Sequence, residues 1–218
     1  MFNFVLIIAF IAALFTSCHE DPQSVDYSKI TGIVNEGNSY NNRIDSVYAF
    51  IYTGYLDNGN YQSVKSEVIA KAKFQNGGFI LQLPPLSNEQ LYTTIGKIYT
   101  DTVIISDKNV RVNFLNLKCI SDGYNIGAMF YHNNLNRLDS GYLESEYIYC
   151  DKPVTINGST KASNWYSFTT HYYAINLKKG WNILTKKMRN NGIEFRTNFS
   201  SNDPSADEKW YPSIIMAR

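Results

Sequence analysis

Apolar and polar residues alternate in short runs over most of this chain. In residues 68–74 every even position is apolar and two of the three odd positions are lysine, which is the two-residue period of a half-buried β-strand. Turn dipeptides such as Asn157-Gly158 and Asn191-Gly192 separate the runs, and no run keeps a helical period. These patterns predict an all-β fold. The expected strands are residues 30–34, 45–53, 68–74, 79–83, 102–105, 110–117, 126–131, 147–150, 154–156, 168–177, 181–188 and 193–199.

Polar residues 106–109 divide this series of strands into two parts. Each part holds at least five expected strands, which is enough for a small antiparallel sandwich of the immunoglobulin type. We therefore predict an N-terminal β-sandwich at residues 29–107 and a C-terminal β-sandwich at residues 108–218. One larger unit is the alternative.

The first eighteen residues have a different pattern. The run from Phe4 to Phe15 is twelve apolar residues long, whereas a helix that crosses a membrane needs about 20. Small residues and Cys18 follow the run, and the chain then becomes polar, which is typical of a cleaved signal peptide. We predict a signal peptide at residues 1–17, a lipidated Cys18 and a linker at residues 18–28. Ordinary secretion, with Cys18 incidental, is the alternative.

Leu14, Ser17 and Cys18 resemble the lipobox of bacterial lipoproteins, and loose lipoboxes that end in Ser-Cys resemble those of Bacteroidota. Glu20 and Asp21 resemble the acidic surface-export signal found there. The resemblance implies a palmitate-bearing lipoprotein of a Gram-negative outer membrane, exposed at the cell surface. More than one acyl chain makes such anchoring stable, since each buried CH₂ contributes about 0.8 kcal/mol.

The amino-acid composition of the chain limits the classes of molecule that it can bind. Lys and Arg number 20 against 19 Asp and Glu, and a near-neutral chain lacks the basic excess that nucleic acid requires. The 17 Tyr and 12 Phe favour strands over helices. Two cysteines, Cys119 and Cys150, remain after Cys18. In an oxidising compartment they can form a disulfide, and two buried free thiols are the alternative.

Little in the sequence points to catalysis. Three histidines are scattered, whereas metal sites need clustered ligands, and no catalytic motif occurs. Glu144 and Glu146 alternate along one strand face and resemble a glycosidase pair, but solvent-facing pairs of this kind are common. We therefore expect no catalytic residue, no metal and no cofactor.

Aromatic residues offer two candidate stacking sites for a ligand. Trp165 and Tyr166 stand among polar residues in an expected loop, which can display rings. Tyr48, Phe50 and Tyr52 share one face of an expected strand, and packing between sheets is the alternative for these three rings.

Two further stretches carry a family resemblance. Residues 147–158, Tyr-Ile-Tyr-Cys-Asp-Lys-Pro-Val-Thr-Ile-Asn-Gly, and residues 177–182, Leu-Lys-Lys-Gly-Trp-Asn, resemble an uncharacterised family of Bacteroidota outer-membrane lipoproteins with paired β-sandwich regions. In the second motif we expect Gly180 to form a turn and Trp181 to fill the end of a core, with sugar stacking as the alternative.

These patterns together predict a lipid-anchored, non-catalytic binding protein for a glycan or another protein. A fimbrillin-like pilus component is the alternative, because the apolar residues 214–216 could form an exchanged strand. In the other interpretation of this tail it is a final core strand. A hydrolase with a carboxylate pair is the least favoured interpretation.

Overall fold

The computed structural model describes residues 26–57, 60–91, 93–98, 102–133, 141–163, 168–190, 194–201 and 205–214. The structure confirms the all-β prediction, and its sheets are open, which is consistent with a sandwich. The described strands are β1 (Lys29–Ile33), β2 (Ser46–Asp57), β3 (Asn60–Lys73), β4 (Gly78–Gln82), β5 (Thr93–Thr94), β6 (Val103–Ile105), β7 (Arg111–Phe114), β8 (Asn116–Ser121), β9 (Tyr124–His132), β10 (Leu143–Cys150), β11 (Val154–Ser163), β12 (Phe168–Leu177), β13 (Gly180–Asn190), β14 (Glu194–Ser200) and β15 (Lys209–Ile214). The helical elements described are η1 (Gly37–Tyr40), η2 (Asn88–Gln90) and α2 (Ile95–Ile98). None of the described helices is long and apolar enough to cross a membrane.

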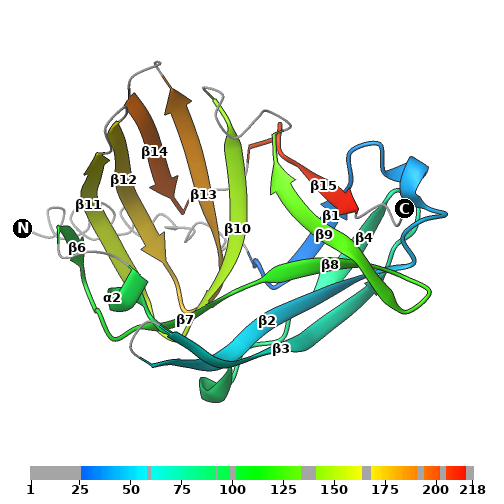
Figure 1. The fold of residues 1–218 in the computed structure, drawn as a ribbon, viewed down its shortest axis with the longest axis horizontal. Coiled ribbons are helices and arrows are strands. Elements are labelled where there is room, and N and C mark those ends of the chain that lie inside the picture. Colours follow the sequence, from blue (N-terminus) through cyan, green and yellow to red (C-terminus); the bar gives the residue numbers. More distant parts are fainter. Residues whose placement is uncertain are drawn as a thin grey trace, which may run out of the picture.

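One sheet holds most of the described strands (Figure 1). Its order is β3-β2-β8-β9-β10-β13-β14-β12-β11-β6, with β15 beside β9, β7 beside β10 and β5 beside β7. A second sheet contains β1 and β4. The pairings are antiparallel except between β12 and β14, which run parallel because β14 lies between β12 and β13.

Strand pairing crosses the expected boundary after residue 107 in both directions. Strand β2 lies before that boundary and pairs with β8 after it, with Val47 opposite Cys119. Strand β6 lies before it and pairs with β11 after it, with Ile105 opposite Ile156. Strands on both sides of this position thus belong to one sheet, which differs from two sandwiches divided there. Pairings between distant parts of the chain, and not the polar residues 106–109, decide which strands are neighbours.

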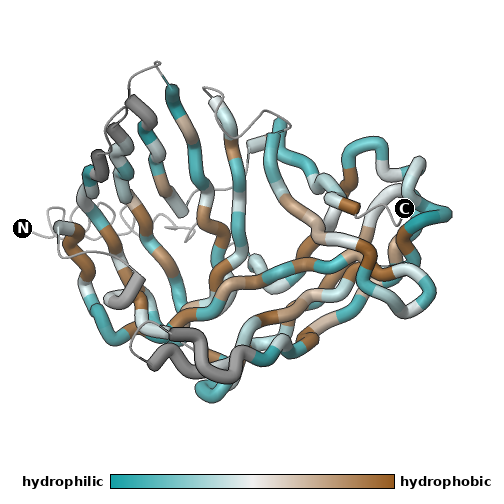
Figure 2. The backbone as a smooth tube through the Cα atoms, in the orientation of Figure 1, coloured by the Kyte–Doolittle hydropathy of each residue, from teal (hydrophilic) through white to brown (hydrophobic). Residues whose placement is uncertain are grey.

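Two buried clusters lie on opposite faces of β10. The first is packed between the β1–β4 pair and the strands β2, β8, β9 and β15, and it includes Tyr147, Tyr149 and Trp210. The second lies on the side of Ile148 and Cys150 and is covered by α2, β6 and β7. Successive residues of a strand point to opposite faces, so β10 contributes alternate residues to each cluster. Figure 2 shows a mainly hydrophilic upper end of β13, whereas hydrophobic segments of β11, β12 and β13 lie lower in the view.

The Leu-Lys-Lys-Gly-Trp-Asn motif has a structural role. Gly180 has a φ of 99°, a conformation that disfavours residues with a Cβ. The side chain of Asn182 holds the turn: its Oδ1 accepts from the Lys178 amide, and its Nδ2 donates to the carbonyls of Lys178 and Gly180. Trp181 is 7% exposed and its Nε1 donates to the Pro84 carbonyl at 2.8 Å. Trp181 therefore fills the core.

The last described strand belongs to the same fold. Strand β15 pairs with β9 from Lys209 to Ile214, and Ile214 packs against the first cluster. A Cβ on Gly127 would overlap the carbonyl oxygen of Ser213, so glycine permits this close pairing. Residues 209–214 therefore form a final core strand of the same fold. Residues 215–218 lie outside the described part of the chain.

We expect Trp181→Ala to lower the free energy of unfolding by about 3–5 kcal/mol, because it leaves a large cavity. Trp181→Phe keeps an aromatic ring but leaves the Pro84 carbonyl without its donor, at a cost of about 1–3 kcal/mol. Tyr124→Ala is the matched control, since Tyr124 is 76% exposed, and it should stay within about 0.5 kcal/mol of wild type. Urea unfolding measures all three; equal stability of the three variants would contradict a core role for Trp181.

Candidate functional site

A fork in the sheet creates an opening among β7–β8, β9 and β10. Strand β9 pairs with β8 up to Met129 and with β10 from Tyr131 onward. Strand β10 pairs with β9 at Glu144 and Ser145 and with β7 from Ile148 onward. Between these pairings the strand edges diverge, and Phe130 and residues 146–147 stand at the fork.

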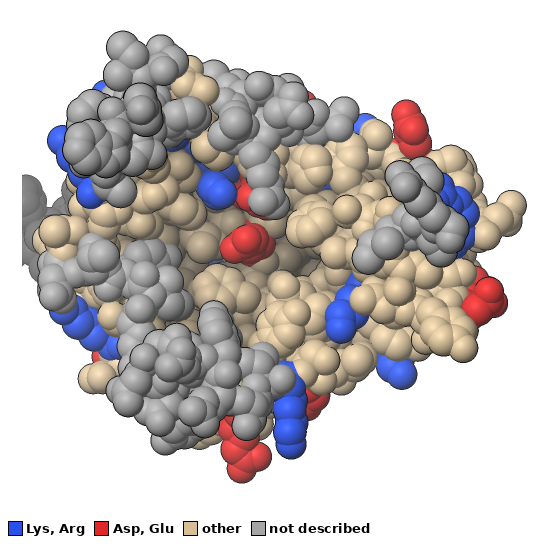
Figure 3. Space-filling model, in the orientation of Figure 1, with Lys and Arg blue, Asp and Glu red and all other residues tan. Residues whose placement is uncertain are grey.

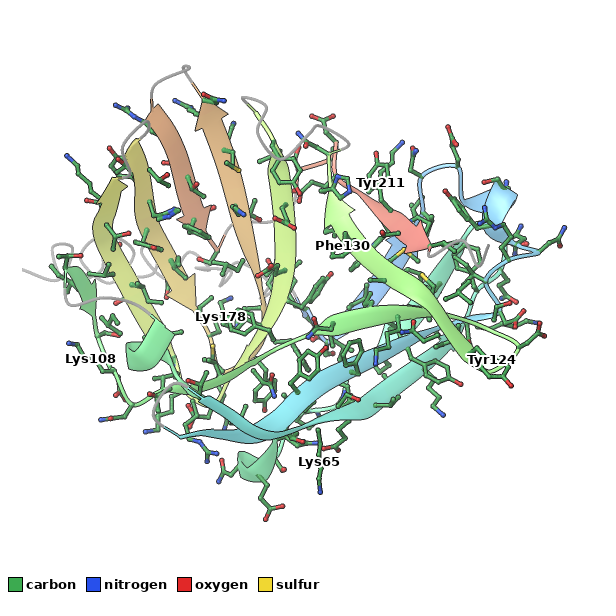
Figure 4. All side chains as sticks on the ribbon, in the orientation of Figure 1. Lys65, Lys108, Tyr124, Phe130, Lys178 and Tyr211 are labelled. Carbon is green, nitrogen blue, oxygen red and sulfur yellow. The ribbon has the colours of Figure 1, made fainter. Side chains whose placement is uncertain are left out.

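A groove with a volume of about 690 Å³ lies at this opening. Figure 3 shows this face of the molecule hollowed at its middle, with acidic atoms over β10 and a basic group beside them over β13. Figure 4 labels Phe130 on β9, beside the gap toward β10. Seven of the lining residues are aromatic: Phe50, Tyr52, Phe114, Phe130, Tyr131, Tyr147 and Trp210.

Phe50 and Tyr52 form one wall of the groove. They lie on the face of β2 opposite to Val47 and Ile51, which belong to the first core cluster. Their rings meet edge to face at 5.4 Å, and Tyr52 is 42% exposed. The Lys118 ammonium lies 3.9 Å from the centroid of the Phe50 ring, a cation–π contact. Phe50 is only 4% exposed, so of these two rings the display interpretation matches Tyr52, and burial matches Phe50.

Glu144 and Glu146 line the groove from β10. Glu144 is buried and Glu146 is exposed. The Lys186 ammonium lies 3.4 Å from Glu144 Oε2, and Lys186 is directly opposite Glu144 in the register of β13. The groove thus offers carboxylate oxygens beside rings, and the carboxylate of Glu144 is paired with the Lys186 ammonium.

The inner end of the groove is a stack of rings above a buried carboxyl group. Trp210 stacks on Tyr131 at 4.8 Å and on Tyr147 at 6.3 Å. Burial raises the pKa of the nearby Glu208 carboxyl, although hydrogen bonds from Ser145 and from the Ser205 amide act in the opposite direction. Burial, and then the charge of Glu208, raises the pKa of Tyr131. The inner end of the groove therefore combines aromatic rings with one buried carboxyl group.

Several residues expected to be functional fall elsewhere. Cys18, Trp165 and Tyr166 lie outside the described residues. Within the described ranges no group of three or more His, Cys, Asp or Glu side chains is placed to hold a metal.

Cys119 and Cys150 are both free and buried. They belong to different core clusters, Cys119 to the first and Cys150 to the second, because β8 and β10 present them to opposite sides of the sheet. The structure therefore matches the alternative of two buried free thiols and not the disulfide. Burial raises the pKa of each thiol to about 12.

We expect neither thiol to react with iodoacetamide at pH 8 in the folded protein. The thiolate is the reactive form, and a pKa raised from 9.0 to about 12 lowers its population about 1,000-fold. Both cysteines should be alkylated after unfolding in denaturant without reductant. Peptide mapping by mass spectrometry reads the labels, and alkylation after unfolding that requires prior reduction would show a disulfide instead.

The sequence pattern identified part of the groove and missed the rest. The alternation of apolar and aromatic residues singled out Phe50 and Tyr52, and the spacing of Glu144 and Glu146 placed both carboxylates on one face. Phe130 carried no distinguishing signal, since it reads as an ordinary strand residue, and Trp210 lies outside every strand that the sequence predicted. Comparison of the chain with protein-family models, with curated proteins and with solved structures gave no match in any of the three.

Proposed function

We propose that this chain is a lipid-anchored, non-catalytic glycan-binding protein of a Gram-negative outer membrane, facing the cell surface, and that the groove between β9 and β10 is its binding site. The observation that carries the proposal is the concentration of aromatic rings around a groove whose polar groups include two carboxylates. The signal-peptide pattern at residues 1–17 and Cys18 supports the anchor.

A sugar is the ligand that this chemistry suits best. A pyranose ring has C–H groups on its faces and hydroxyl groups at its rim, and the face of an aromatic ring carries negative charge density that attracts C–H groups. Tyr52 and Phe130 are 42% and 40% exposed at the groove and can cover such a face. Carboxylates such as Glu146 accept hydrogen bonds from hydroxyls.

The charge of the lining favours a neutral sugar. Lys118 is the only basic residue among the described residues that line the groove, against Glu144 and Glu146. An anionic glycan therefore meets a single basic side chain in the described lining.

Loss of a groove ring should weaken binding. We expect Tyr52→Ala and Phe130→Ala each to reduce affinity about 2- to 12-fold, which corresponds to the roughly 0.5–1.5 kcal/mol that one ring contact contributes. Affinity electrophoresis in gels that contain starch, xylan, mannan or dextran identifies a ligand, and calorimetry on its oligosaccharide measures the affinity.

Tyr124→Ala is the control for these variants. It removes a ring from the far end of β9, outside the groove lining (Figure 4), and it should bind as wild type does. Equal retardation of wild type and both groove variants in every gel would count against the sugar site. A protein ligand captured by wild type and lost in Phe130→Ala would replace the glycan with a protein partner.

The hydrolase interpretation has one observation in its favour, since Glu144 and Glu146 both line the groove. Glycosidase carboxylates flank the scissile bond from two sides. Here both come from one face of one strand, and Glu144 is held by Lys186. Binding therefore has the better support. The pilus alternative loses support from β15, which is already paired with β9.

We expect Cys18→Ser to abolish lipid attachment. The thiol of Cys18 is the atom that would carry the acyl-bearing group, so the variant should incorporate no radiolabelled palmitate and should leave the membrane fraction. Protease treatment of intact cells should degrade the wild-type protein if it faces the surface. Wild-type protein that carries no label and fractionates like Cys18→Ser would overturn the anchor.

A further inference from the structure

A second group of rings lies on the same sheet face as the groove. Directly paired residues of neighbouring strands share a face. Across β10, β13, β14 and β12 these pairs are Glu144 with Lys186, Lys186 with Phe199, and Phe199 with Tyr173. One row of side chains therefore leads from the carboxylate at the groove to two aromatic rings on distant strands.

The second group is compact. The rings of Tyr173 and Phe199 stack at 5.1 Å with 13° between their planes, and His171 lies 5.8 Å from Phe199. All three side chains are half-buried, and Tyr173 and Phe199 pack against the second cluster. Part of each ring therefore stays accessible in the described structure.

The region between the two aromatic groups carries little net charge. Nδ1 of His171 is buried without a hydrogen-bond partner among the described residues, so this atom faces the protein interior. Burial, and then the charge of Lys186, lowers the pKa of His171, which favours the uncharged imidazole. Between the two aromatic groups, Lys186 and Glu144 form an ion pair, so the path from one to the other carries little net charge.

The distance between the two groups sets the size of a ligand that would touch both. Strand β9, which carries Phe130, is four strand spacings from β12 in the sheet order. At about 4.8 Å per paired spacing this is at least about 19 Å along the sheet, because β9 and β10 diverge beside Phe130. A single sugar cannot span it, whereas a chain of several sugars can.

We propose that His171, Tyr173 and Phe199 form a second subsite, and that the ligand is an extended neutral oligosaccharide that crosses β10, β13 and β14 from Phe130 to Tyr173. This inference rests on the proposed glycan-binding function and specifies the length and charge of the ligand. The two aromatic groups hold the ends of the sugar chain, and the Glu144–Lys186 pair lies beneath its middle.

Affinity as a function of chain length tests the second subsite. Oligosaccharides from the disaccharide to the octasaccharide, prepared from the polysaccharide that retards the wild type, are titrated into the full-length protein by calorimetry. Wild-type affinity should rise once the chain is long enough to reach β12. Tyr173→Ala should remove that rise, with an affinity loss of about 3- to 10-fold for the octasaccharide and none for the disaccharide.

Tyr172→Ala is the matched control, because Tyr172 is the adjacent residue, points to the opposite face and is 37% exposed. It should retain the full dependence on length. Tyr173→Leu removes the aromatic ring but keeps an apolar side chain beside the second core cluster. This variant replaces Tyr173→Ala in the titrations if Tyr173→Ala lowers the melting temperature. A purely structural role for Tyr173 would shift melting and leave the length dependence unchanged.

The outcomes separate the two proposals. Wild-type affinity that is flat with length, or equal curves for Tyr173→Leu and Tyr172→Ala, overturns the second subsite, and the groove proposal stands if Tyr52→Ala still weakens the disaccharide. Absence of wild-type binding at every length overturns the glycan proposal itself.

Discussion

Each edge of a β-strand can hydrogen-bond to one neighbour at any position, and this constraint shapes the molecule at β9. The same edge of β9 bonds to β8 as far as Met129 and to β10 from Tyr131. The two neighbours must then diverge, so an opening forms beside Phe130. The groove follows from that change of partner. Residues from both faces of β10 line it, and it gives access to the Trp210 stack, because the strands do not close the opening.

Local alternation was sufficient to predict the fold class and most strand positions, because the period of apolar residues depends only on which face is buried. It also predicted the role of Trp181, since glycine followed by a large ring is a turn that enters a core. It could not predict where strands change partners. Residues 110–117 read as one strand, yet Leu115 separates β7 from β8, and the two halves pair with different strands.

The candidate site was harder to predict than the fold, because its residues are brought together by pairings between distant parts of the chain. Phe50, Phe130 and Trp210 stand on β2, β9 and β15, and nothing in their own neighbourhoods indicates a shared groove. The insertion of β14 between β12 and β13 is equally non-local, and it is what places Phe199 beside Tyr173. Glu208 is buried for the same reason, since its surroundings come from β9 and β10.

The strand pairings that cross residue 107 have a consequence for how the chain acquires its structure. A chain that emerges N-terminus first presents β2 and β3 long before β8 exists to pair with β2, and the first cluster is incomplete until Trp210 of β15 has been made. Non-local pairing of this kind makes folding slow. Incomplete strand edges are prone to aggregation in the meantime. A chain cut before β15 therefore lacks the ring that completes the first cluster, whatever its earlier strands have already formed.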